Sequence, residues 1–156
     1  MAADHFTDNT GHEMTDSSAS GATGGCLCGA VRYRVEGPLG EAHACHCGQC
    51  RRQSGHYVVG VDVNWDHVRI EGEADLRWYE ASPIARRGFC GRCGSKLFWV
   101  SEEYGGSIHA GSLDAPTGLT LKSHIFVADK GDYYEITDDL PKFMSYPGAE
   151  GDAGAT

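Results

Sequence analysis

Hydrophobic and polar residues alternate along this chain with the two-residue period that is typical of β-strands. In the clearest case, Val31, Tyr33 and Val35 alternate with charged residues and predict a strand with one buried face. No stretch keeps a helical apolar period over three turns, so we expect a mostly β fold with little helix. Other segments of strand composition are short and bounded by glycine or polar residues: 57–63, 68–70, 76–79, 97–99, 107–111 and 124–127.

One short helix is expected at residues 49–54, closed by Gly55. It would place Cys50 near the start of the helix, where backbone N–H groups favour a thiolate. Residues 133–136 and a turn at residues 138–143 complete the body of the chain, and the sequence contains no internal repeat.

The length of 156 residues suits one domain, and charge divides the chain into a body and two ends. Residues 1–23 carry four acidic residues and no basic one, and residues 148–156 add two acidic residues. Both ends lack the apolar content needed for a core, so we expect disordered tails there and a folded domain at residues 24–147. The net charge is −9, but the body holds 16 acidic against 13 basic residues and is nearly neutral.

This composition excludes several classes of partner. A nucleic-acid-binding protein needs a clustered basic surface, which this chain lacks, so we expect no nucleic-acid partner. No run approaches the roughly 18 apolar residues of a membrane helix, so we expect no membrane partner. The first residues lack the basic start and apolar run of a secretory signal, and we therefore expect a cytoplasmic protein.

All seven cysteines lie in three short groups, and their spacing is the strongest chemical signal in the chain. An odd number, no export signal and tight spacing argue against disulfide bonds and for metal ligands. Cys90 and Cys93 bracket a tight turn in which Gly94 can supply a positive φ, and a strand running through Cys26 and Cys28 would project both thiols from one face. Four thiols would complete a closed tetrahedral zinc site: Cys26, Cys28, Cys90 and Cys93.

The remaining cysteines, Cys45, Cys47 and Cys50, form the pattern C-x-C-x-x-C. Three ligands leave a tetrahedral ion one ligand short, which distinguishes catalytic zinc sites from closed structural ones. Three thiolates outweigh the charge of Zn²⁺, so the ion would be a weak Lewis acid but a good site for a further soft ligand, which it would deprotonate. The expected partner is therefore a small thiol. Arg51 and Arg52 could meet a carboxylate of that molecule, or be ordinary surface arginines.

Two other interpretations of these three cysteines remain open. A histidine could complete a second structural zinc site, and His43, His46 and His56 are near enough in the sequence. Of these, His46 would point away from its cysteine neighbours in an extended segment. The cysteines could also stay metal-free and act as a redox-sensitive thiol group.

Seven short segments stand in the order and spacing of a known family: residues 25–29, 45–51, 54–55, 89–94, 97–98, 111–114 and 124–125. In these segments the chain resembles the glutathione-dependent formaldehyde-activating enzyme family, which includes the centromere-protein-V branch, over about residues 24–146. The resemblance implies a zinc-containing β-tent fold of short antiparallel strands. It also implies two zinc ions per chain, one structural and one held by Cys45, Cys47 and Cys50.

The resemblance further implies a function. In the name-giving enzyme the second zinc receives the thiol of glutathione, which adds to formaldehyde to give S-hydroxymethylglutathione, and members are classed as carbon–sulfur lyases. We therefore expect a zinc-dependent carbon–sulfur lyase acting on a thiol–aldehyde adduct, with Cys45, Cys47 and Cys50 as its catalytic residues. The alternative is a non-catalytic zinc-binding module that binds a protein partner.

Other residues are less well defined by the resemblance. His46 and His124 are candidates for a general base, and both also suit a supporting role in the core. Tyr133 and Tyr134 stand where many family members have a tryptophan. No set of glutathione contacts beyond the cysteines can be matched, so the resemblance carries over the fold and the metal sites rather than the substrate.

Overall fold

The computed structural model describes residues 21–148, which form two β-sheets, one α-helix and four 3₁₀ helices. The smaller sheet is antiparallel and has the order β1 (Thr23–Gly25), β2 (Arg32–Val35), β5 (Val68–Glu71). The larger sheet has the order β10 (Leu121–Ile125), β3 (Ala42–Cys45), β4 (Val58–Val63), β9 (Gly105–His109), β8 (Lys96–Ser101), β7 (Ala85–Cys90), β6 (Leu76–Ser82). The helices are α1 (Gly48–Ser54), η2 (Trp65–His67), η3 (Glu73–Asp75), η4 (Ala110–Ser112) and η5 (Val127–Asp129).

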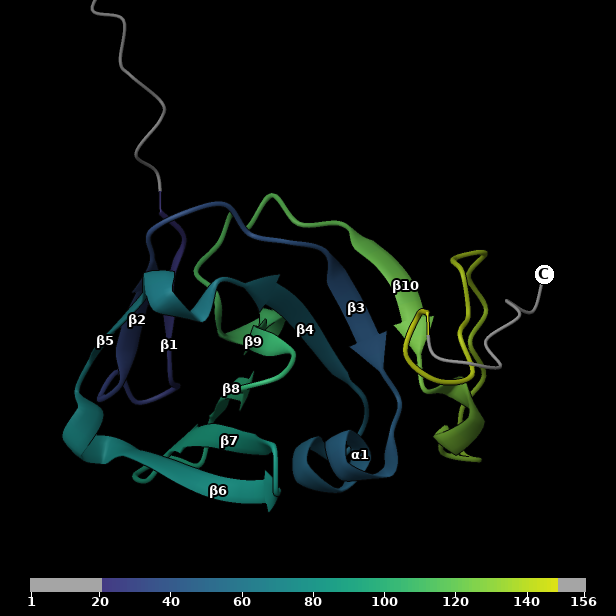
Figure 1. The fold of residues 1–156 in the computed structure, drawn as a ribbon, viewed down its shortest axis with the longest axis horizontal. Coiled ribbons are helices and arrows are strands. Elements are labelled where there is room, and N and C mark those ends of the chain that lie inside the picture. The colour runs from purple at the N-terminus through teal and green to yellow at the C-terminus, as the bar shows by residue number, and fades with distance from the viewer. Residues whose placement is uncertain (1–20, 149–156) are drawn as a thin grey trace, which may run out of the picture.

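The hydrophobic core lies between the two sheets (Figure 1). The smaller sheet contributes Tyr33 and Val35, and the larger sheet contributes Phe98, Val100 and Ile108. The rings of Tyr33 and Phe98 meet edge to face with their centroids 5.1 Å apart, a favourable arrangement for aromatic pairs. The alternation along β2 therefore buries the face that the sequence pattern predicts.

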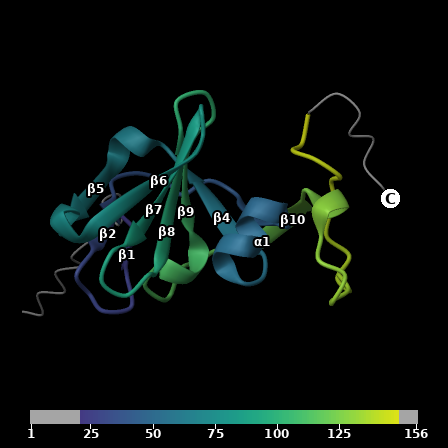
Figure 2. The same cartoon turned by 90° about the horizontal axis from the view of Figure 1, so that it is seen from below.

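The opposite face of the larger sheet carries Trp99 and several polar side chains. Directly opposed residues share a face, and the register aligns Arg87 on β7 with Trp99 on β8, and Trp99 with Ser107 on β9. His109 lies two residues beyond Ser107 and so belongs to the same face. Figures 1 and 2 show α1 beside the ends of β3 and β4, and Arg87 connects this face to the helix through Gln49.

The prediction of a mostly β fold with little helix is confirmed. The predicted strands correspond to β2, β4, β5, β6, β8, β9 and β10, and the predicted helix corresponds to α1, which ends at Gly55 with φ 85°. Residues 110–111 and 127 were wrongly assigned to strands, because they lie in η4 and η5. Residues 133–136 contain no strand.

Three strands were not predicted: β1, β3 and β7. β3 is built on small residues, Ala42 and Ala44, whose burial comes from the neighbouring strands rather than from strong strand propensity. β7 contains two arginines and a glycine and so lacks an apolar alternation. The predicted tails lie outside the described residues apart from residues 21–23 and 148, and β1 begins at Thr23.

β10 runs parallel to β3, which departs from the predicted antiparallel arrangement. The outer edge of β10 is covered by the C-terminal segment, residues 126–148, which lies beside it in Figure 1. The His124 N–H donates to the carbonyl of Pro141 at 2.9 Å, and the Phe143 N–H donates to the carbonyl of His124 at 2.9 Å. None of the helices in residues 21–148 is long and apolar enough to span a membrane.

Candidate metal centres

Four cysteine side chains meet where the turn after β1 approaches the end of β7. We call this group, Cys26, Cys28, Cys90 and Cys93, the four-cysteine cluster; its Sγ atoms all lie within 4.8 Å of one another. The Sγ atoms of Cys26 and Cys28 are 3.6 Å apart, and those of Cys28 and Cys90 are 3.8 Å apart. Four thiolates at about 2.3 Å from zinc are about 3.8 Å apart, so this donor set fits one zinc ion.

Two tight turns supply these ligands, and each contains a glycine with a positive φ. In the first turn Gly29 has φ 78° and its N–H donates to the carbonyl of Cys26 at 3.1 Å. In the second turn Gly94 has φ 77° and its N–H donates to the carbonyl of Cys90 at 2.9 Å. The positive φ predicted at Gly94 is confirmed. The condition of a strand running through Cys26 and Cys28 is not met, because β1 ends at Gly25 and a turn orients the two thiols.

The other three cysteines meet at the junction of β3 and α1. Cys45 is the last residue of β3, Cys47 is the N-cap of α1, and Cys50 lies in the first turn of the helix. We call them the three-cysteine cluster; their Sγ atoms also lie within 4.8 Å of one another. The Cys50 N–H donates to the Cys47 Sγ at 3.3 Å, as in a side-chain helix cap. The end of a strand, a helix cap and the first helical turn thus bring three thiols close together.

Among residues 21–148, no further cysteine, histidine, aspartate or glutamate joins the three-cysteine cluster. The histidines considered as a fourth ligand turn elsewhere. His43 hydrogen-bonds to Ser123 at 2.8 Å. His56 hydrogen-bonds to Tyr133 at 3.1 Å, and His46 turns toward β10. A structural site closed by one of these histidines is therefore unsupported, and the cluster offers a metal ion one thiol fewer than the four-cysteine cluster does.

All seven cysteines are free, in agreement with the expectation of metal ligands rather than disulfides. Hydrogen bonds from the thiols of Cys45 and Cys50 lower the pKa of Cys47 to about 2, and the backbone N–H groups of Cys50 and Gln49 add to this effect. The pKa of Cys45 is raised, because its proton is held by Cys47 and Cys50 and because the group is buried. Cys47 is therefore the first thiolate of the cluster, and a bound metal ion would displace the remaining protons.

The sequence did not indicate Arg87, a buried cation beside the three-cysteine cluster. Its side chain is 6% exposed, and its Nη1 lies 3.7 Å from the Cys50 Sγ. The guanidinium also donates to the Oε1 atoms of Gln49 at 3.1 Å and Gln53 at 3.4 Å. Its Nε is buried without a hydrogen-bond partner in the described part of the chain. Arg87 thus joins β7, α1 and a thiol of the cluster.

The neighbouring arginines are placed differently. Arg86 lies on the other face of β7, with its guanidinium 4.3 Å from the ring centroid of Trp78. The alternation of side chains along a strand would have predicted opposite faces for Arg86 and Arg87, but β7 itself was not predicted. Arg51 and Arg52, the predicted carboxylate partners, lie in the last turn of α1; Arg51 is half-buried and Arg52 is exposed.

A chain of hydrogen bonds starts from His46, between two of the cluster cysteines. His46 Nε2 lies 2.9 Å from His124 Nδ1, and His124 Nε2 lies 2.9 Å from an oxygen of Asp138. The Tyr134 hydroxyl hydrogen-bonds to His46 Nδ1. Burial lowers the pKa of His46 to about 4, and repulsion by His124 contributes. Both candidate general bases therefore belong to a chain that ties the C-terminal segment to β3, in which Tyr134 is a further member.

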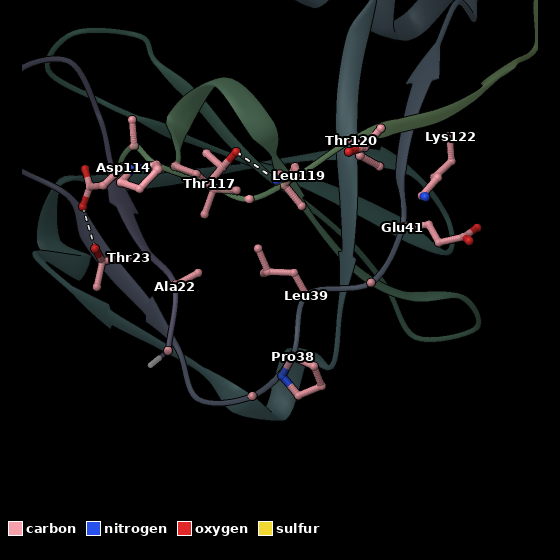
Figure 3. A pocket seen from close by; sticks show the side chains of 18 residues that line it. Ala22, Thr23, Pro38, Leu39, Glu41, Asp114, Thr117, Leu119, Thr120 and Lys122 are labelled. Atoms are coloured by element: carbon pink, nitrogen blue, oxygen red, sulfur yellow. Dashed lines mark hydrogen bonds between the residues drawn. The ribbon is translucent and has the colours of Figure 1, made fainter. Parts of the chain in front are cut away.

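One cavity lies away from both clusters. It measures about 760 Å³ and is lined by loop residues that include no cysteine (Figure 3). Its walls come mainly from residues 21–23, the β2–β3 loop and the loop before β10. Hydrogen bonds from Thr23 to Asp114 (2.6 Å) and from the Leu119 N–H to Thr117 (3.2 Å) hold its rim. Because no group of metal ligands lines it, the clusters rather than the cavity identify the chemistry.

Two curated proteins are similar in sequence to this chain. A Halomonas elongata protein that bears the name of the glutathione-dependent formaldehyde-activating enzyme family is 30% identical over 125 residues, covering 72% of this chain and 79% of that protein. A Schizosaccharomyces pombe protein described as an uncharacterised lyase is 25% identical over 124 residues, covering 77% and 88%.

A solved structure and a family model complete the comparison. The crystal structure of a Rhodobacter sphaeroides protein shares the fold with a TM-score of 0.52 and 24% identity, covering 65% of this chain and 98% of that one. The model of the glutathione-dependent formaldehyde-activating enzyme family matches residues 21–129, which contain both cysteine clusters. The chain belongs to the glutathione-dependent formaldehyde-activating enzyme family.

Proposed function

We propose that the protein is a zinc-dependent carbon–sulfur lyase-type enzyme that joins a small thiol to an aldehyde. Glutathione and formaldehyde are the pair that the family suggests, with S-hydroxymethylglutathione as the product. The family name and the relative described as a lyase support an enzyme. The observation that carries the proposal is the three-cysteine cluster, which gathers three thiols and no fourth ligand group from residues 21–148.

The proposal assigns one zinc ion to each cluster, within a domain at residues 24–147. The four-cysteine cluster supplies a complete tetrahedron and would hold a structural ion. Cys45, Cys47 and Cys50 would hold the second ion, which, when bound, supplies a site where a thiol is kept as its thiolate. Both donor sets consist of sulfur alone, which suits zinc in proteins.

The proposed reaction needs few groups from the chain. The thiol sulfur adds to the aldehyde carbon, the S–C bond forms, the C=O π bond breaks, and the proton from the thiol ends on the oxygen. Cys50 is buried, whereas Cys45 and Cys47 are partly exposed, so the substrate would approach from their side. The hydrogen-bond chain from His46 to Asp138 holds the backbone between these two cysteines in place.

Exchange spectroscopy on mixtures of glutathione and formaldehyde tests this proposal. We expect the wild-type protein to accelerate exchange between free and adducted glutathione, and Cys47→Ser to return it to the uncatalysed rate. Metal analysis of the same samples should give two zinc ions for the wild type and one for the variant. Equal acceleration by both proteins would refute the proposal.

A further inference from the structure

Within the described residues 21–148, the charge of Arg87 has no carboxylate partner. None of the ion pairs in residues 21–148 includes this residue, although its side chain is only 6% exposed. Its hydrogen-bond partners are the neutral amides of Gln49 and Gln53 and the sulfur of Cys50. A buried cation is costly unless an anion compensates it. The three-cysteine cluster is the anionic group in contact with Arg87.

The charges of this centre can be counted. Three thiolates and one divalent ion sum to −1, and the guanidinium of Arg87 brings the centre to zero. An anionic fourth ligand would then bring the net charge of the centre to −1, whereas without Arg87 it would reach −2. Because the guanidinium is held by two glutamines four residues apart on α1, its charge stays beside Cys50.

We propose that Arg87 is a positioning residue that balances the charge of the three-cysteine metal centre and thereby favours an anionic fourth ligand. The inference deepens the proposed function, in which that ligand is a substrate thiolate. Opposite charges in a partly buried site attract each other strongly enough to change ligand affinity by about tenfold or more.

The experiment uses the protein loaded with cobalt(II), whose absorption bands report the ligands of the metal. The loaded protein is titrated with 2-mercaptoethanol and, separately, with azide. We expect Arg87→Gln to weaken both ligands by about tenfold or more, whereas Arg87→Lys, which keeps the charge, stays within about threefold of wild type. Arg86→Gln removes a charge from the other face of the same strand and should change neither affinity.

A second variant leaves Arg87 in place. Gln49→Glu puts a carboxylate where an amide oxygen now lies 3.1 Å from the guanidinium, which neutralises the charge without opening a cavity. We expect it to weaken both ligands in the same direction as Arg87→Gln. Retention of the cobalt bands of the four-cysteine cluster and of the melting temperature shows that each variant is folded.

The outcomes separate the two proposals. Unchanged affinities in Arg87→Gln and Gln49→Glu would overturn the inference, as would equal losses in Arg87→Gln and Arg87→Lys, because charge would then not be the cause. If azide binds with this dependence on Arg87 and thiols do not bind at all, the inference stands and the proposed function fails. If thiols bind without dependence on Arg87, the proposed function stands and the inference fails. Absence of binding by both ligands to the wild type would overturn both.

Discussion

The two cysteine clusters use the same ligand atom in opposite surroundings. In the four-cysteine cluster, Cys26 and Cys90 belong to the hydrophobic core and Cys93 packs against it. The three-cysteine cluster lies outside this core, next to the buried charge of Arg87. An apolar setting suits a site that stabilises the fold, whereas buried polar groups around a site are typical of functional sites.

The clusters also differ in how much chain they connect. The four-cysteine cluster joins two turns separated by about sixty residues, and so it closes a long loop that the unfolded chain leaves open. The three-cysteine cluster spans six residues, which a strand end and a helical turn already hold together. We therefore expect metal at the first cluster to determine stability and metal at the second to determine activity.

The largest effect should come from breaking one ligand of each cluster. Cys90→Ser leaves a buried hydroxyl in place of a ligand that is fully buried, and we expect it to lose metal and at least about 5 kcal/mol of unfolding free energy, or to fail to fold. Cys47→Ser should lose metal at its own cluster and change the melting temperature by only a few degrees. Urea unfolding with metal analysis measures both, and similar destabilisation by the two variants would contradict the comparison.

A smaller effect concerns His109, on the polar face of the larger sheet. Burial lowers its pKa to about 4, and the charge of Arg87 contributes. The unfolded chain protonates this histidine near pH 6.5, whereas the folded protein does so only near pH 4. The neutral imidazole of His109 therefore makes its full contribution to stability above pH 6.5, and this contribution falls as the pH drops toward 4.

Relative to wild type, His109→Gln should remove about 2 kcal/mol of the stability loss between pH 7.5 and pH 5. Thermal or urea unfolding at both pH values measures the difference. His67→Gln, at an exposed position, is the matched control and should leave the pH dependence unchanged. The same pH dependence in His109→Gln and wild type would show that this histidine is not held neutral.

The smallest effects compare two glycines with similar positive φ angles. Gly94, φ 77°, ends the second turn of the four-cysteine cluster, and Gly55, φ 85°, ends α1. A Cβ at either position meets no atom within 4 Å, so an alanine costs only the strain of a positive φ, about 1 kcal/mol. Gly94→Ala should weaken metal binding at the four-cysteine cluster and Gly55→Ala at the three-cysteine cluster, as measured by chelator competition. A loss at the wrong cluster would contradict this assignment.

Local patterns predicted well what local forces determine. The alternation around Tyr33 located β2, and Gly55 located the end of α1, because a strand face and a helix cap depend on neighbours within a few residues. β3 and β7 were missed because their stability comes from strands that are distant in the sequence. The sequence left open whether a strand or a turn carries Cys26 and Cys28, because either can bring two thiols that are two residues apart to one ion, and the structure shows a turn.

The sequence by itself determined the fold class, the division of seven cysteines into four and three, and the family. These follow from the type and the close spacing of ligand residues, which can be read from short segments of the chain. Only the tertiary structure decided that His43 and His56 turn away from the three-cysteine cluster and that Arg87, rather than Arg86, lies beside it. The physical reason is that sheet register sets which face a side chain occupies and which distant side chains it meets, and register depends on pairing across the whole chain.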